Sequence, residues 1–441
     1  MYKAVYFMCT FQFLDSLQVL YFPYMPIHSI LYRLLIGFFS SRFHSSRVTP
    51  LIDVHFTSFS DQEKVLLSDS GPGADVVVGN KMAAFARELI HDQRASSAPM
   101  AELDDSVEQI KINGGEVRLV SLGLRISIQL TSVIFEVKGA PELLLKYDLN
   151  CNSLAGFHPL VRESVVLNQI AHLDISPKLI YLSSPRKYSR DLLSRKTTVK
   201  LPVEHQRDCA MAETSALRVM AIEKVGISLY KMLSVKFFTL HESLSMTIQL
   251  LDAIEKLHSA DIVHGDIHPG NVVVDESSGV KIIDFGKSFF QSDFIGYQPI
   301  IRPRLSVVHY MLSPFTLEGF RLGFRDDVFN ALTVMGALLM GRPFINYLKQ
   351  LEWNGNALLA LKKDLYYFKY PNPRTGRVVD PVEDDEYLPI NAKKSVKDHF
   401  QNALNIARSQ PHVEAPSAPA IESIRQQLRA ALEIVTAHSI L

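Results

Sequence analysis

The sequence predicts an α+β fold in which strands precede helices. Residues 117–149 are rich in β-branched and aromatic residues, and a turn-forming KGAPE segment at 138–142 divides them, which is typical of strands. Farther along, apolar residues recur at helical spacing from 244 to 257, and residues 328–339 are apolar almost all round, as in a buried helix. Residues 262–286, between these two helices, carry the polar residues around which the chain is organised.

Composition narrows the function classes. The 441 residues contain 46 Lys plus Arg and 46 Asp plus Glu, so the formal net charge is zero and no nucleic-acid partner is expected. The three cysteines, Cys9, Cys151 and Cys209, form no CxxC pair, which favours a reducing compartment and no structural metal. We therefore expect a cytoplasmic protein.

The first 115 residues divide into two parts. Residues 1–40 form a hydrophobic N-terminal extension, for which a signal peptide, a membrane anchor, an amphipathic flap and a packing extension are the alternatives. Pro23 and Arg33 interrupt the apolar run that a bilayer helix needs, yet membrane association through this extension stays open. Residues 41–115 are expected to be linker or irregular, with a short helix at 81–91. The apolar face of that helix would comprise Met82, Phe85, Leu89 and Ile90.

Two short apolar runs within residues 262–286 flank a turn-forming segment, which predicts a strand hairpin. A loop precedes the first strand and an acidic residue ends the second, so Asp266, Asn271 and Asp284 lie around one end of the hairpin. Phosphoryl transfer needs such a set. One carboxylate orients the attacking hydroxyl and accepts its proton, while a second carboxylate and an amide oxygen hold magnesium against the nucleotide phosphates. Asp266 fits the first role, and Asn271 and Asp284 fit the second.

This stretch resembles the catalytic loop and magnesium motif of the protein-kinase superfamily. His264, Asp266 and Asn271 stand at the family's spacing, and residues 284–286 form its DFG. A lone HxD or DFG is a weak signal, but the two joined by a hairpin of the right length are specific. The resemblance implies Asp266 as the catalytic carboxylate and Mg²⁺ bound by Asn271 and Asp284.

The resemblance also implies a bilobal fold. A single protein-kinase-like domain would span residues 116–441, with a β-rich N-lobe at 116–226 and a helical C-lobe at 227–441. ATP and Mg²⁺ would be its cofactors, and its partner would be a protein substrate that offers a serine or threonine hydroxyl.

Two N-lobe residues complete the catalytic set that the resemblance implies. Lys146 ends the third strand, where it would bind the nucleotide phosphates, and Glu163 lies near the start of the following helix, where it would hold that lysine. Residues 216–225 read as an apolar strand that ends at the hinge, against which adenine would lie. The residues expected to contact the nucleotide are Val133, Lys146, Ile222, Glu223 and Val225.

Three features depart from the protein-kinase pattern. Ile126, Ile128 and Thr131 occupy positions where a phosphate-covering loop is normally rich in glycine. Gly265 replaces the arginine that reads activation-loop phosphorylation in many kinases. His268 replaces the lysine that serine/threonine kinases place two residues past the base, and it is cationic only part of the time near neutral pH.

Two finer likenesses point in different directions. The RDD at 325–327 and the missing APE resemble the casein kinase one branch. The HGDIHPGN loop at 264–271 resembles small-molecule phosphotransferases of the aminoglycoside and choline kinase kind. We expect a serine/threonine protein kinase, with two alternatives: an enzyme that phosphorylates a small metabolite, and a pseudokinase that uses the fold as a binding scaffold.

Overall fold

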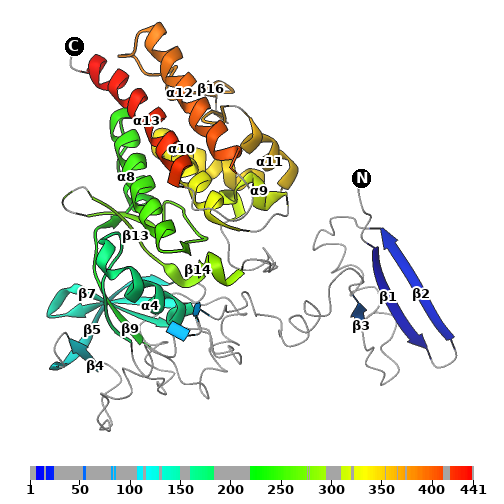
Figure 1. The fold of residues 1–441 in the computed structure, drawn as a ribbon, viewed down its shortest axis with the longest axis vertical. Coiled ribbons are helices and arrows are strands. Elements are labelled where there is room, and N and C mark those ends of the chain that lie inside the picture. The colour runs from blue at the N-terminus through cyan, green and yellow to red at the C-terminus, as the bar shows by residue number, and fades with distance from the viewer. Residues whose placement is uncertain are drawn as a thin grey trace. The chain divides into compact units, whose positions relative to one another are not determined.

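The structure is a computed structural model in which the chain forms two units, Met1–Gly73 and Ala74–Leu441 (Figure 1). The described residues are 6–13, 16–23, 53–55, 81–82, 84–85, 107–112, 116–128, 132–148, 159–182, 219–275, 277, 279–294, 309–318, 322–352, 354–364, 366–372, 375–410 and 418–439. Before residue 81, and in the strands between 107 and 128, the description covers the backbone alone.

The described part of the first unit is a three-stranded antiparallel sheet. β1 (Tyr6–Phe13) pairs along its full length with β2 (Ser16–Pro23), and β3 (Asp53–His55) pairs with the other edge of β1. The apolar extension predicted at 1–40 is therefore extended strand at these positions. Its association with a membrane stays a prediction.

The N-lobe of the second unit contains a six-stranded antiparallel sheet in the order β4-β5-β6-β7-β9-β8. The strands are β4 (Val107–Ile112), β5 (Glu116–Ile128), β6 (Ser132–Lys138), β7 (Ala140–Asp148), β8 (Leu179–Leu182) and β9 (Val219–Glu223). Period-two alternation explains the buried face, because Phe135 and Val137 of β6 and Leu145 and Tyr147 of β7 are all buried. The predicted strands within 117–149 are confirmed as β5, β6 and β7.

The folded domain begins upstream of the predicted boundary at 116. β4 pairs with β5 in register from Val107 opposite Ser121 to Ile112 opposite Glu116. Farther upstream, Lys81, Met82, Ala84 and Phe85 are helical, and Met82 is 2% exposed in the core of the domain. The short helix predicted at 81–91 is confirmed at these four residues, which we call the docked residues (Lys81, Met82, Ala84 and Phe85), although the predicted boundary at 116 left them outside the domain. The rest of the helix predicted at 81–91, including Leu89 and Ile90, lies outside the described residues.

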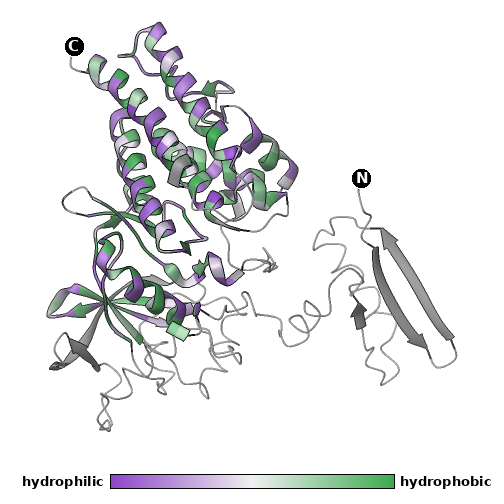
Figure 2. Cartoon of the chain, in the orientation of Figure 1, coloured by the Kyte–Doolittle hydropathy of each residue, from purple (hydrophilic) through white to green (hydrophobic). Residues whose placement is uncertain are grey.

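Helices build the C-lobe. The main ones are α8 (Leu240–Ser259), α10 (Phe324–Glu352), α12 (Ile390–Arg408) and α13 (Ala418–Ser439). α8 packs against both α10 and α13, and α13 packs against α12 (Figure 1). Figure 2 shows hydrophobic and hydrophilic residues alternating along α12 and α13, as expected of helices with one face on the core. A capping box starts α8, since Thr239 and Glu242 bind each other's backbone N–H groups.

α10 is the central helix of the C-lobe. It is long and apolar enough to cross a membrane, but 83% of its apolar stretch is buried inside the fold, as in a soluble core helix. It begins at Phe324, four residues before the apolar stretch predicted at 328–339, and bends at Gly341, whose φ is 70°. The shorter elements of the C-lobe are α7 (Leu229–Met232), α9 (Pro314–Leu317), α11 (Gly355–Lys363), β10 (Ile227–Ser228), β11 (Ile262–Val263), β12 (Val272–Val274), β13 (Val280–Ile282), β14 (Phe289–Phe290), β15 (Tyr370–Pro371) and β16 (Val378–Val379).

Candidate active site

The predicted hairpin is confirmed as β12 and β13. Its register pairs Val272 with Ile282 and Val274 with Val280. Asp275 closes the turn by accepting the Gly279 N–H at 2.8 Å. At the open end, the Ile283 N–H donates to the Asn271 carbonyl at 2.9 Å. The hairpin therefore brings residue 271 beside residue 284, as the sequence analysis expects.

A buried carboxylate on α10 holds the loop before this hairpin. Asp327 accepts the backbone N–H groups of His264 at 2.7 Å and Gly265 at 2.9 Å, and it lies 3.2 Å from Nε2 of His258. Gly265 has a φ of 76°, and a Cβ there would lie 2.9 Å from the Leu322 side chain. The glycine at 265 is thus a requirement of the backbone.

His264 joins the loop to the hairpin. Its Nδ1 accepts the Asp266 N–H at 3.2 Å, so Nε2 carries the proton and donates to the Ile283 carbonyl at 3.1 Å. Burial lowers the pKa of this imidazole, although the nearby carboxylates oppose the shift. A neutral His264 therefore fixes the position of Asp266.

The Asp266 side chain is surrounded by donors. Its Oδ2 accepts Lys287 Nζ at 2.7 Å and Asn271 Nδ2 at 3.3 Å, and Nε2 of His268 lies 3.6 Å away. Burial alone would raise the pKa of Asp266, but the hydrogen bonds and positive charge of His268 and Lys287 hold it below its ordinary value. Asp266 is thus an ionised carboxylate at neutral pH.

Sequence reasoning missed Lys287, the residue that follows the DFG. A signal was available, because a hairpin with 272 opposite 282 places residues before its first strand near residues after its second. A lysine at 287 is then within reach of an acid at 266.

On the N-lobe side, Lys146 lies between two carboxylates. Its Nζ is 2.7 Å from Glu163 Oε2 and 2.8 Å from Asp284 Oδ1. Burial raises the pKa of Glu163 to about 7 against the attraction of Lys146. The pKa of Asp284 lies far below its ordinary value, since the Lys146 ammonium outweighs the effect of burial. The predicted Lys146–Glu163 pair is present, with Asp284 as its third member.

Asn271 and Asp284 present oxygens that suit Mg²⁺. The Asn271 amide nitrogen donates to the Asp266 carbonyl at 3.0 Å, which leaves its amide oxygen for a metal. Oδ1 of Asp284 accepts a hydrogen bond from Lys146, and the second carboxylate oxygen of Asp284 could bind the metal. Mg²⁺ typically takes one or two protein oxygens together with water and substrate phosphates, so this small donor set fits the ion. Among the described residues, no group of three or more His, Cys, Asp or Glu side chains forms a metal cluster.

The predicted hinge follows β9. Ile222 is buried, and Val225 is half-buried in the segment that leads to α7. The Glu223 N–H donates to the Lys178 carbonyl at 3.0 Å, so among the predicted hinge amides that of Val225 is better placed for adenine. Gly226, with a φ of 42°, allows the chain to pass directly against the Val274 carbonyl. The side chain of Val133 lies outside the described residues, as do those of Ile126, Ile128 and Thr131.

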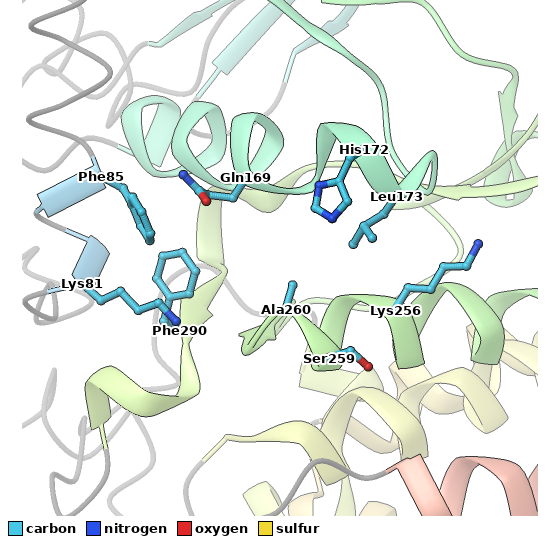
Figure 3. Close-up of a pocket in the computed structure, with 9 residues that line it drawn as sticks. All are labelled: Lys81, Phe85, Gln169, His172, Leu173, Lys256, Ser259, Ala260 and Phe290. Carbon is cyan, nitrogen blue, oxygen red and sulfur yellow. The ribbon is translucent and has the colours of Figure 1, made fainter.

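A separate cavity of about 410 Å³ lies between the end of α4 (Pro159–Ile170), the end of α8 and the docked residues (Figure 3). It is lined by Lys81, Phe85, Gln169, His172, Leu173, Lys256, Ser259, Ala260 and Phe290. None of the predicted site residues lines it. The predicted site residues instead gather at the open end of the β12–β13 hairpin, between Lys146 and Asp266, a region that we call the cleft.

The fold and the site define a class, that of bilobal protein-kinase-like domains. Consistent with this class, residues 207–371 match the family described as "Protein kinase domain". The chain is similar to the mitogen-activated protein kinase mpkC of Emericella nidulans, with 26% identity over 174 residues, which are 39% of this chain and 40% of that protein.

Bacterial proteins are similar to the chain as well. The probable serine/threonine-protein kinase SCO3848 of Streptomyces coelicolor is 30% identical over 156 residues, 35% of this chain and 21% of that protein. The probable serine/threonine-protein kinase PknB of Corynebacterium glutamicum is 29% identical over 106 residues, 24% of this chain and 16% of that protein. The chain thus spans well under half the length of these relatives.

Proposed function

We propose that the protein is an ATP-dependent serine/threonine protein kinase. The observation that carries the proposal is the arrangement of charges: the β12–β13 hairpin brings together an ammonium held by two carboxylates and a carboxylate held by Asn271 and Lys287. Relatives named as serine/threonine or mitogen-activated protein kinases support a protein acceptor.

The nucleotide side positions the phosphates. Lys146 binds them, Glu163 keeps that lysine in place, and adenine lies against Ile222 with the Val225 amide as a donor. Asn271 and Asp284 would hold Mg²⁺, which neutralises phosphate charge when bound. Because Lys146 and Asp284 already contact each other, nucleotide and metal enter a preformed arrangement.

The acceptor side handles the proton. Asp266 accepts the proton of the substrate hydroxyl as the hydroxyl oxygen forms a bond to the terminal phosphorus of ATP. The bond between that phosphorus and the bridging oxygen breaks, and ADP leaves with the electron pair. Lys287, Asn271 and His268 meet at Oδ2 of Asp266, so Oδ1 is the oxygen that would face the acceptor.

A small-molecule acceptor is the second candidate, and the HGDIHPGN loop is the observation that favours it. In that reading the same cleft works on a metabolite hydroxyl. The likeness of the RDD segment to the casein kinase one branch favours a protein acceptor instead.

Mg²⁺-dependent ATP turnover by the full chain tests the proposal. We would compare the wild type with Asp266→Asn, Asp284→Ala and the control Asp398→Asn, which changes an exposed acid on α12. A generic protein acceptor and a panel of small hydroxyl compounds would be supplied in parallel. We expect turnover on protein, its loss in the first two variants and its retention in the control.

Other results have distinct meanings. Turnover on small hydroxyl compounds alone would establish the second candidate. If the protein shows no turnover and binds nucleotide weakly and independently of Mg²⁺, the result would support the pseudokinase alternative.

We also propose a cytoplasmic location with membrane contact through residues 1–40. Fractionation of cells that express the full chain and a chain lacking these residues would test it. If both chains distribute equally between the soluble and membrane fractions, the proposed membrane contact is contradicted.

A further inference from the structure

The cleft contains two lysine ammonium groups with different surroundings. Lys146 is almost fully buried and is committed to Glu163 and Asp284, both within 2.8 Å. Lys287 pairs with Asp266 at 2.7 Å, and its side chain is 28% exposed. Lys146 therefore serves the nucleotide side, and Lys287 brings positive charge to the acceptor side.

The histidine in the same loop is a weaker source of charge. The Gly270 N–H donates to Nδ1 of His268 at 3.0 Å, so a neutral ring carries its proton on Nε2, facing Asp266. A Cβ on Gly270 would lie 2.7 Å from this ring, which means that the glycine permits the close approach. Nε2 of His268 thus points toward Asp266 from 3.6 Å, whereas the Lys287 ammonium contacts the same oxygen at 2.7 Å.

The backbone around Lys287 is anchored on both sides. Phe285 is fully buried and packs edge-on against His264, with ring centroids 4.9 Å apart. Ser288 donates its N–H to the Phe285 carbonyl at 3.0 Å and its hydroxyl to the His264 carbonyl at 3.1 Å. The stem of Lys287 is therefore fixed relative to the catalytic loop, while its head reaches the cleft.

We propose that Lys287 is a catalytic residue that binds the phosphoryl group during its transfer. The inference rests on the proposed phosphotransferase function. An ammonium has three N–H donors, so Lys287 can bind Asp266 and a phosphoryl oxygen at the same time. Asp266 also marks the place where the acceptor oxygen meets phosphorus, so this ammonium lies where negative charge accumulates.

Proton transfer strengthens this role. Before the reaction, Lys287 is drawn to the negative charge of Asp266. When Asp266 takes the hydroxyl proton, that charge disappears and the attraction weakens. The ammonium then interacts more strongly with the phosphoryl oxygens, at the stage of the transfer when negative charge builds up on them. No covalent bond to Lys287 forms or breaks.

The test uses four variants of the full chain in the ATP turnover assay: Lys287→Met, Lys287→Arg, Lys287→Met combined with His268→Lys, and Lys281→Met. Lys281 is the matched control, because it lies on β13 and pairs with Asp174 away from the cleft. We expect Lys287→Met to lower kcat by ~10²–10³-fold with little change in the KM for ATP. Lys287→Arg should keep part of the activity, and the combined variant should recover at least about tenfold by supplying the charge from residue 268.

The pH profile separates phosphoryl binding from a purely indirect role. If Lys287 only lowered the pKa of Asp266, raising the pH would restore the full rate of Lys287→Met, and that result would overturn the proposal. Equal kcat values for Lys287→Met and Lys281→Met would overturn it too. In both cases the proposed function would still be supported, provided that the wild type shows turnover and Asp266→Asn abolishes it. A wild type without turnover would instead remove the proposed function itself.

Discussion

The two sides of the cleft stabilise their charges in different ways. On the nucleotide side, the Glu163 and Lys146 side chains are 3% and 6% exposed, and the cluster has two carboxylates for one ammonium. On the acceptor side, Lys287 is 28% exposed, and a set of hydrogen bonds surrounds the single carboxylate of Asp266. The Lys146–Glu163 pair is thus more deeply buried than the Lys287–Asp266 pair, in which the carboxylate is buried and the ammonium is partly exposed.

The largest expected difference concerns stability. Lys146→Met leaves two carboxylates without their buried cation, so we expect the free energy of unfolding to fall by about 3–5 kcal/mol. Lys287→Met removes a partly solvated pair and should cost about 1 kcal/mol or less. Chemical denaturation of both variants measures the two costs. Equal losses of unfolding free energy in the two variants would show that the two lysine clusters do not differ in burial and pairing as described.

The second prediction is that the two sides respond to pH in opposite directions. The folded pKa of Glu163, about 7, lies above its ordinary 4.5, so its contribution to stability is complete below pH 4.5 and is lost as the pH rises through 7. The folded pKa of Asp266 lies below its ordinary 3.8, so its contribution exists above pH 3.8 and is lost as the pH falls further.

Two variants measure this contrast. Glu163→Gln should flatten the pH dependence of unfolding between pH 4.5 and 7, by at most about 3.5 kcal/mol at ~1.4 kcal/mol per pKa unit. Asp266→Asn should flatten it only below pH 4. Unfolding followed across pH 3–8 checks both variants, and a slope unchanged by Glu163→Gln would contradict the assignment.

The third prediction concerns the docked residues, which border both sides. Phe85 lines a cavity with Gln169 of α4, the helix that carries Glu163 (Figure 3). Phe85 also packs on Phe290, which follows the DFG, with ring centroids 5.4 Å apart. Met82→Ala should lower the free energy of unfolding by about 2 kcal/mol. The control Val378→Ala changes a residue that is 53% exposed and should be nearly neutral.

If the two sides are energetically independent, Met82→Ala should leave the ratio of KM for ATP to KM for the acceptor unchanged. A change in that ratio would show that the docked residues favour one side. Steady-state kinetics on both substrates supply the measurement.

The separation of residues along the chain decides what the sequence could predict. Asp266, Asn271 and Asp284 lie within one hairpin, so their spacing alone located them. Lys146 and Glu163 followed from the resemblance to protein kinases, whose order of strand and helix the sequence matches. The docked residues are bound by Asp293, which accepts the N–H groups of Lys81 and Met82 from more than 200 positions away. No local pattern announces such a contact, so the start of the domain was placed too late.

The hydrogen bonds of Asp327 determine how readily the catalytic loop unfolds. Its bonds to the N–H groups of His264 and Gly265 are buried and arise from the first turn of α10, the central helix of the C-lobe. Those two amides should therefore exchange hydrogen with solvent only when α10 itself unfolds, far more slowly than amides near the exposed Lys287 head group. The catalytic loop would then keep its shape through local fluctuations of the N-lobe and lose it in a single step with the core.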